Sequence, residues 1–155
     1  MLARLFALPI MMTLTSTTAL AQSQDTDVRA KASRVTGEAL IEAFSGVTHK
    51  GAYNFSAQGR ASNFYTETHL KDGPVKYSEG GQAHDGDWAI FRDSLCYSYD
   101  EADMPGGCFR VYKIGTCYYF YSASIREMQD ELDRDYWTAR SVQDGDEPTC
   151  EAVFS

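Results

Sequence analysis

Alternating apolar and polar positions cover most of the chain beyond residue 47 and predict a run of short strands. The candidate strands are Thr48–Phe55, Asn63–Leu70, Val75–Glu79, Asp87–Phe91, Ser94–Tyr99, Cys108–Lys113, Thr116–Tyr121 and Tyr136–Arg140. Turn residues such as Asp72-Gly73-Pro74 and Arg92-Asp93 separate them, and Gly80-Gly81 predicts a bulge or a bend. Strands of this length and spacing are typical of an antiparallel meander.

Two other stretches have apolar residues at helical spacing. These residues are Leu40, Ile41 and Phe44 in the first, and Ile125, Met128 and Leu132 in the second. Thr36 is the expected N-cap of the first helix, Glu38 suits its first turn, and Gly46 is expected to end it. The second helix is expected over Ser124–Asp135.

A meander of this kind leaves two exposed edges unless the sheet curls or closes. We therefore expect a mainly β fold with minor α content. Its form would be a lipocalin-like barrel or half-barrel, with one short N-terminal helix and one helix near the C-terminus.

The first 21 residues have the pattern of a secretory signal peptide. Arg4 supplies a positive charge, an apolar stretch follows from Leu5 to Leu14, and Ala19-Leu20-Ala21 forms a small-residue cleavage site. The apolar stretch is shorter than the roughly 20 residues that a transmembrane helix needs. We expect residues 22–32 to be a flexible leader and residues 33–155 to be one domain. No cysteine follows the cleavage site, so the expected location is the periplasm or the outside of the cell, without a lipid anchor.

The chain is acidic, with a formal net charge of −8 that becomes more negative when Arg4 is removed with the signal peptide. Nucleic acids and anionic membranes require a basic surface, so neither is an expected partner. A small ligand, a glycan or an envelope protein remains possible, and a cationic partner would be attracted. Solubility alone also explains the acidity.

Four cysteines follow the signal peptide, and an even number in an exported chain predicts two disulfides. They are Cys96, Cys108, Cys117 and Cys150. Three pairings are possible, and the sequence does not choose between them. We favour Cys96–Cys108, across a predicted hairpin, and Cys117–Cys150, which would tie the C-terminal tail to the body. The spacings contain no Cys-x-x-Cys pair, which disfavours zinc.

Several residues are candidates for metal or acid–base chemistry. Neutral imidazoles bind zinc or copper, so His49, His69 and His84 could form a metal site if they converged. Glu67 and Glu79 flank one turn and could act as paired carboxylates on a glycan. Ordinary surface or hydrogen-bonded roles explain all five. No catalytic residue and no cofactor are expected.

Two short Asp-Gly-Asp stretches, Asp85–Asp87 and Asp144–Asp146, resemble fragments of a calcium loop. Neither has the ordered set of oxygen ligands that such a loop needs, and we interpret both as turns. No serine lies in a Gly-x-Ser-x-Gly elbow, and no phosphate-binding glycine loop is present.

Aromatic residues crowd three successive predicted strands. Side chains alternate between the two faces of a strand, so the run Tyr118–Tyr121 must place aromatics on both faces. One face would pack the core, and the other could bind sugars, small amphiphiles or proteins. The candidate binding residues are Tyr97, Tyr99, Tyr112, Tyr119, Tyr121 and Trp137. A core on both sides of the sheet, with one face under a helix or under Trp137, is the alternative.

The middle of the chain resembles a broad group of small exported bacterial proteins of unknown function. The matching stretches are Phe44-Ser45-Gly46, Gly86-Asp87-Trp88, Asp93–Tyr97 and Cys108–Tyr112. The resemblance implies a curled sheet and supports the Cys96–Cys108 pairing, and it implies no catalytic residue.

These patterns favour a non-enzymatic periplasmic or secreted binding or accessory protein. Its ligand would lie on the aromatic sheet surface or in the mouth of the barrel. The alternatives are a metal- or carboxylate-dependent hydrolase of cell-envelope material, an inhibitor of a cationic hydrolase such as lysozyme, and a purely structural envelope protein.

Overall fold

The computed structural model describes residues 32–54, 63–104, 106–124 and 137–150 of the chain. Its strands and its one described helix are β1 (Ser33–Val35), α2 (Glu38–Phe44), β2 (Val47–Tyr53), β3 (Phe64–His69), β4 (Pro74–Glu79), β5 (Gln82–Phe91), β6 (Ser94–Tyr99), β7 (Gly107–Ile114), β8 (Cys117–Ser122) and β9 (Ala139–Gln143). The signal peptide, most of the leader and the second predicted helix lie outside the described residues.

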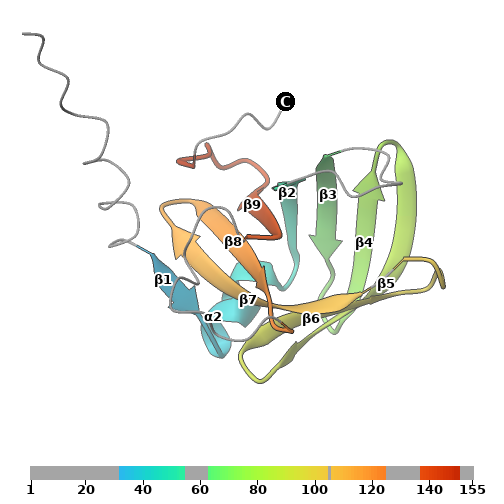
Figure 1. Ribbon diagram of the computed structural model, residues 1–155, viewed down its shortest axis with the longest axis horizontal. Helices are drawn as coiled ribbons and strands as arrows, with labels where there is room; N and C mark the ends of the chain where they lie inside the picture. The colour runs from blue at the N-terminus through green and yellow to red at the C-terminus, as the bar shows by residue number, and fades with distance from the viewer. Residues whose placement is uncertain (1–31, 55–62, 105, 125–136, 151–155) are drawn as a thin grey trace, which may run out of the picture.

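Strands β2 to β9 form a closed antiparallel barrel of eight strands (Figure 1). Each strand pairs with the next along the chain, and β9 returns to pair with β2 through registers such as His49 with Gln143. Closure satisfies the backbone of both edge strands at once. The predicted mainly β barrel is therefore confirmed.

Strand β1 lies beside the barrel and completes the wall along β7. The β6 strand pairs with β7 only from Leu95 with Phe109 to Tyr97 with Gly107. From Val111 onward the same edge of β7 pairs instead with β1, beginning at Val35. This three-residue strand was not predicted from the sequence. We call the place where β7 exchanges β6 for β1 the seam.

Helix α2 packs its buried residues Leu40 and Phe44 into the barrel core. Gly46, with φ 76°, follows the helix as predicted. The expected cap was wrong, because Gly37 occupies the N-cap position and its N–H donates to the Asp93 carboxylate at 3.1 Å. The expected apolar face was also wrong at one position, since the side chain of Ile41 is half exposed.

Three boundaries or turns differ from the prediction. Strand β5 begins at Gln82, five residues earlier than expected, so Asp85-Gly86-Asp87 lies within a strand and forms no turn. Gly80 and Gly81, for which a bulge or a bend was predicted, form the tight turn between β4 and β5, both with positive φ. The last strand runs over Ala139–Gln143 and not Tyr136–Arg140. Asp144–Asp146 is a turn, as expected.

One inward-facing position of β2 is a glycine that makes room for an aromatic ring of β3. A Cβ on Gly51 of β2 would lie 2.1 Å from Cζ of Tyr65, its partner on β3. Glycine is therefore needed there because the ring of Tyr65 crosses the backbone of β2. The interior is thus a packed core, as small eight-stranded barrels allow.

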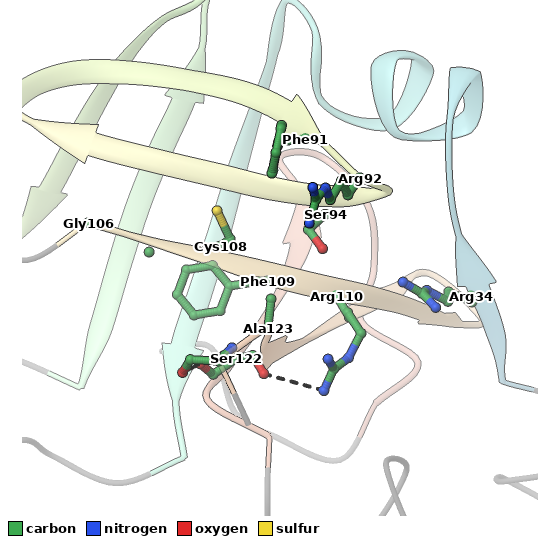
Figure 2. Close-up of a pocket in the computed structure, with 12 residues that line it drawn as sticks. Arg34, Phe91, Arg92, Ser94, Gly106, Cys108, Phe109, Arg110, Ser122 and Ala123 are labelled. Atoms are coloured by element: carbon green, nitrogen blue, oxygen red, sulfur yellow. Dashed lines mark hydrogen bonds between the residues drawn. The ribbon is translucent and has the colours of Figure 1, made fainter. Parts of the chain in front are cut away.

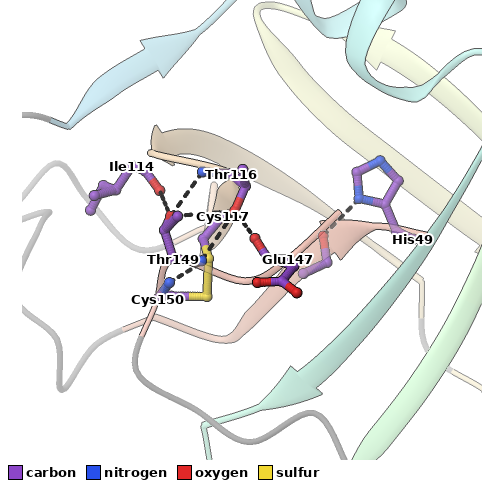
Figure 3. Close-up of a disulfide and its surroundings, with 8 residues drawn as sticks. His49, Ile114, Thr116, Cys117, Glu147, Thr149 and Cys150 are labelled. Carbon is purple, nitrogen blue, oxygen red and sulfur yellow. Dashed lines mark hydrogen bonds between the residues drawn. A yellow bond between two sulfur atoms is a disulfide. The ribbon is translucent and has the colours of Figure 1, made fainter. Parts of the chain in front are cut away.

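Both favoured disulfides, Cys96–Cys108 and Cys117–Cys150, are present. The first joins directly opposed residues of β6 and β7. The second fixes the tail against the β7–β8 turn, where Thr149 and Thr116 exchange hydrogen bonds of 2.9 and 3.1 Å (Figure 3). No helix among the described residues is long and apolar enough to cross a membrane.

Candidate functional site

The inward faces of β2, β3 and β4 bring most of the predicted titratable residues into the barrel. The register pairs His49 with Glu67 and Glu67 with Tyr77, so these side chains share the inner face of the wall. His49, Glu67, His69 and Glu79 are all buried. The antiparallel pairing of β2 with β3 also brings the Thr48 and Thr68 hydroxyls to 2.9 Å on the other face.

His49 is held in place by three contacts. Its Nδ1 and the hydroxyl of Ser141 on β9 share a hydrogen bond of 3.0 Å (Figure 3). Its Nε2 lies 3.1 Å from the carbonyl oxygen of Ala43. The ring of Phe44 stacks on it with centroids 4.6 Å apart. Burial lowers the pKa of His49 to about 4, so the imidazole is neutral near pH 7.

Glu67 and His69 form a buried polar cluster with two tyrosines of β6. Tyr99 donates a hydrogen bond of 2.7 Å to Glu67, and the Tyr97 hydroxyl shares one of 2.9 Å with Nε2 of His69. Burial raises the pKa of Glu67 to about 7, against the lowering effect of the tyrosine hydroxyls. Burial and the nearby His49 lower the pKa of His69 to about 3.

The 3.6 Å approach between Nε2 of His69 and Glu67 is therefore a contact of a neutral imidazole with a carboxyl group, and not an ion pair. The cluster holds a proton on Glu67 over most of the acidic range, and the buried phenol groups of Tyr97 and Tyr99 have raised pKa values for the same reason, burial. Its groups are chemically suited to proton transfer. However, they are buried and are bonded to one another.

The second carboxylate, Glu79, is bonded to a different tyrosine, Tyr77, whose ring centre lies 5.5 Å from that of Tyr99. Tyr77 donates a short hydrogen bond to Glu79, and the Tyr77 hydroxyl also lies 2.9 Å from that of Tyr53. Glu67 and Glu79 are therefore each bonded to their own tyrosine partner, and the structure does not direct them at a shared position.

The three histidines are only partly brought together. The rings of His49 and His69 lie 5.6 Å apart, whereas Nδ1 of His84 lies 3.2 Å from Glu101. Within the described ranges, no group of three His, Cys, Asp or Glu side chains is placed to hold a metal ion.

The predicted aromatic binding residues fall on two sides of the wall. Tyr97 and Tyr99 pack against the barrel core and bond to the buried cluster. Tyr112, Tyr121 and Trp137 form a separate small cluster with the partly buried Tyr119. The rings of Tyr112 and Tyr121 meet edge to face at 5.5 Å, as do those of Tyr119 and Trp137 at 6.2 Å. Both sides of this part of the sheet are thus packed.

A hollow of about 690 Å³ lies at the seam (Figure 2). Its lining comes from β1, the β5–β6 turn, the first half of β7 and the end of β8. The residues are Arg34, Phe91, Arg92, Ser94, Gly106, Gly107, Cys108, Phe109, Arg110, Ser122, Ala123 and Ser124. Pockets of about 300–1,000 Å³ are the usual size for small-molecule sites. We refer to this feature as the seam hollow.

Three arginines reach the seam hollow from three different elements, and the described lining contains no Asp or Glu (Figure 2). Arg34 on β1 and Arg92 in the β5–β6 turn are exposed, whereas Arg110 on β7 is buried. Nη2 of Arg110 donates a 3.4 Å hydrogen bond to the carbonyl oxygen of Ser122. In a chain of net negative charge, this is a local concentration of positive charge.

None of these three arginines was predicted as a site residue from the sequence. Arg110 lies between Phe109 and Val111 in an apolar run, and Arg34 lies on a strand too short to show a period. The one feature of the sequence that pointed to an arginine of the hollow was the predicted turn Arg92-Asp93, because the side chains of a turn lie at one end of the sheet.

Together the fold and site define a closed eight-stranded antiparallel barrel with a polar cluster inside and a cationic hollow in its wall. Comparison with models of known protein families, with curated protein sequences and with solved structures finds no match.

Proposed function

We propose that this protein is an exported, non-enzymatic binding protein that holds a small ligand in the seam hollow. The observation that carries the proposal is the hollow itself, whose volume of about 690 Å³ suits a small organic molecule. Export is supported by the signal-peptide pattern of the first 21 residues and by two formed disulfides, which persist in oxidising compartments.

Binding is favoured over catalysis by the location of the acid–base groups. Glu67 and His69 are buried in the barrel and bonded to tyrosines, and neither lines the seam hollow. The residues that do line it offer hydroxyl, guanidinium and aromatic groups, which are suited to holding a molecule in place.

Mass spectrometry of protein purified from a bacterial periplasm tests this proposal. We expect a mass in the native spectrum that exceeds the denatured mass by that of one small molecule. Ala123→Trp should remove the excess mass because the indole fills the hollow that Ala123 lines. Ala83→Trp, on the exposed part of β5 and outside the lining, is the matched control and should keep it.

A native spectrum without excess mass, together with no difference between the two tryptophan variants in a screen of charged and neutral small molecules, would contradict the proposed function.

A further inference from the structure

We propose that the ligand of the seam hollow is an organic anion: an oxyanion head group held by Arg34 and Arg92, attached to an apolar body that covers Phe91. This inference deepens the proposed function and rests on it.

The rim of the seam hollow is positively charged. Arg34 and Arg92 are exposed at the rim, and neither takes part in an ion pair among the described residues. The nearest acidic neighbour in sequence, Asp93, directs its carboxylate to the N–H of Gly37 at 3.1 Å. Guanidinium groups present fixed pairs of N–H donors that match carboxylate, sulfate and phosphate oxygens. An anion would therefore meet two available guanidinium groups and no described carboxylate in the lining.

The backbone of Arg92 has an unfavourable conformation. Its φ of 49° lies in the left-handed region, where a non-glycine residue is unfavourable. Two-residue hairpin turns of this type usually contain Asn-Gly or Asp-Gly. An arginine here makes the turn less stable than glycine would. It also places a guanidinium group at the rim of the hollow, which glycine could not do.

The seam hollow also has an exposed apolar residue, Phe91, in its lining. The side chain of Phe91 is 61% exposed, the highest value among the large apolar residues described, and it lines the hollow. The guanidinium carbon of Arg92 lies 5.1 Å from the centre of its ring. A single inorganic ion is far smaller than a hollow of about 690 Å³ and would leave Phe91 exposed. An anion with an apolar chain or ring would contact the arginines with its charged group and cover Phe91 with its apolar part.

The test compares four probes on the purified, disulfide-bonded protein by isothermal titration calorimetry. They are decanoate, decanol, decyltrimethylammonium and inorganic phosphate. We expect decanoate to bind at least tenfold more tightly than decanol or the cation, because a hydrogen bond to a charged group is worth about a tenfold change in affinity or more. Phosphate should bind more weakly than decanoate because it makes no contact with Phe91.

Two variants separate this role from folding. Arg92→Gly relieves the left-handed backbone, so it should not lower the melting temperature, yet it should weaken decanoate binding about fivefold or more. Arg34→Gln should weaken it similarly. Lys76→Gln, on the exposed side of β4 and outside the hollow, changes the net charge by the same amount and should leave binding unchanged.

Equal affinity for decanoate and decanol, with no effect of the arginine variants, would overturn the anion inference while leaving the proposed function standing. If phosphate binds as tightly as decanoate, the inference that an apolar body of the ligand covers Phe91 is wrong. If none of the probes binds and no excess mass is found in the native spectrum, the proposed function itself fails.

Discussion

Glu67 carries a carboxyl group whose ionisation differs strongly between the barrel and the unfolded chain. Its pKa rises from an ordinary value of 4.5 to about 7 because it is buried. Between these two values the folded protein binds a proton that the unfolded chain has released, so the free energy of unfolding falls as the pH rises. The loss begins near pH 4.5 and is complete above about pH 7.

Glu67→Gln should remove this loss. The amide is nearly isosteric, it cannot ionise, and its oxygen can still accept the hydrogen bond from Tyr99. We expect the variant to gain stability relative to the parent protein as the pH rises from 4.5 to 7, by on the order of 3 kcal/mol in total. Urea unfolding at several pH values, with the disulfides intact, measures the difference. A stability difference that is independent of pH would contradict the assignment.

His49 and His69 make the free energy of unfolding depend on pH in the opposite direction. The effect of Glu67 is therefore measured as the difference in stability between Glu67→Gln and the parent protein at each pH. Burial lowers the pKa values of the two histidines from 6.5 to about 4 and about 3. The unfolded chain therefore binds protons that the barrel excludes, and stability is lost as the pH falls below about 6.5. Glu67→Gln leaves the ordinary pKa values of both histidines in the unfolded chain unchanged.

At the scale of single residues, the sequence predicted which side chains lie close together better than it predicted which of them are buried. His49 and His69 each follow a threonine on strands predicted to pair, and they do meet inside the barrel. Which face of the strand was buried could not be read from the run Thr66-Glu67-Thr68-His69, because no residue in it is apolar. The burial of Glu67 is imposed by the aromatic rings of other strands.

At the scale of secondary-structure elements, the sequence predicted the strands and turns well and the first residues of the domain poorly. Strand β1 is three residues long and is stabilised by pairing with β7, which is far away in the sequence. Local propensity carries no signal of such a partner. The same applies to the N-cap of α2, whose N–H is satisfied by Asp93 and not by a neighbouring side chain.

The two disulfides should contribute differently to stability. They close loops with sequence separations of 12 and 33, for which the chain-entropy model gives about 3 and about 4 kcal/mol. The β6–β7 ladder has only three register pairs, and Cys96–Cys108 is the middle one. Replacing both of its cysteines by alanine should therefore also loosen the seam locally.

Denaturant unfolding and amide hydrogen exchange measure both effects. We expect the Cys96→Ala/Cys108→Ala variant to exchange faster in β6 and in the first half of β7 than elsewhere. Cys117→Ala/Cys150→Ala should lose more global stability without that local change. Uniformly faster exchange in the first variant would show that the disulfide does not hold the seam.

At the scale of the whole molecule, the closed barrel follows from a simple physical requirement, and the seam hollow does not. Eight strands with turns between them must hide their edges, so closure or strong curling was predictable from Val47 onward. The hollow lies where the pairing of β6 with β7 stops at Leu95 and Phe109, because β7 continues beyond this point and pairs with β1 from Val111. The relative lengths of three separate elements determine that gap, and no local pattern records them.

The proposed export is a property of the whole molecule, because removal of a signal peptide would determine which chain folds, and an oxidising compartment would determine whether its cysteines oxidise. We expect expression in a bacterium to yield a periplasmic protein that begins at Gln22. N-terminal sequencing measures the cleavage site, and denatured masses before and after reduction should differ by four hydrogens. Retention of Arg4 in protein recovered from the periplasm would contradict the signal-peptide assignment.

The pairing of β2 with β9 has a consequence for the order in which the barrel can form. Strand β9 is the last strand of the ring along the chain, so a chain that has not yet folded Ala139–Gln143 cannot complete its barrel. Until β9 pairs, one edge of β2 stays unpaired and available to neighbouring chains. Closing the ring thus depends on contacts of high sequence separation, which form slowly, and the chain whose ring is still open is the species most prone to aggregate.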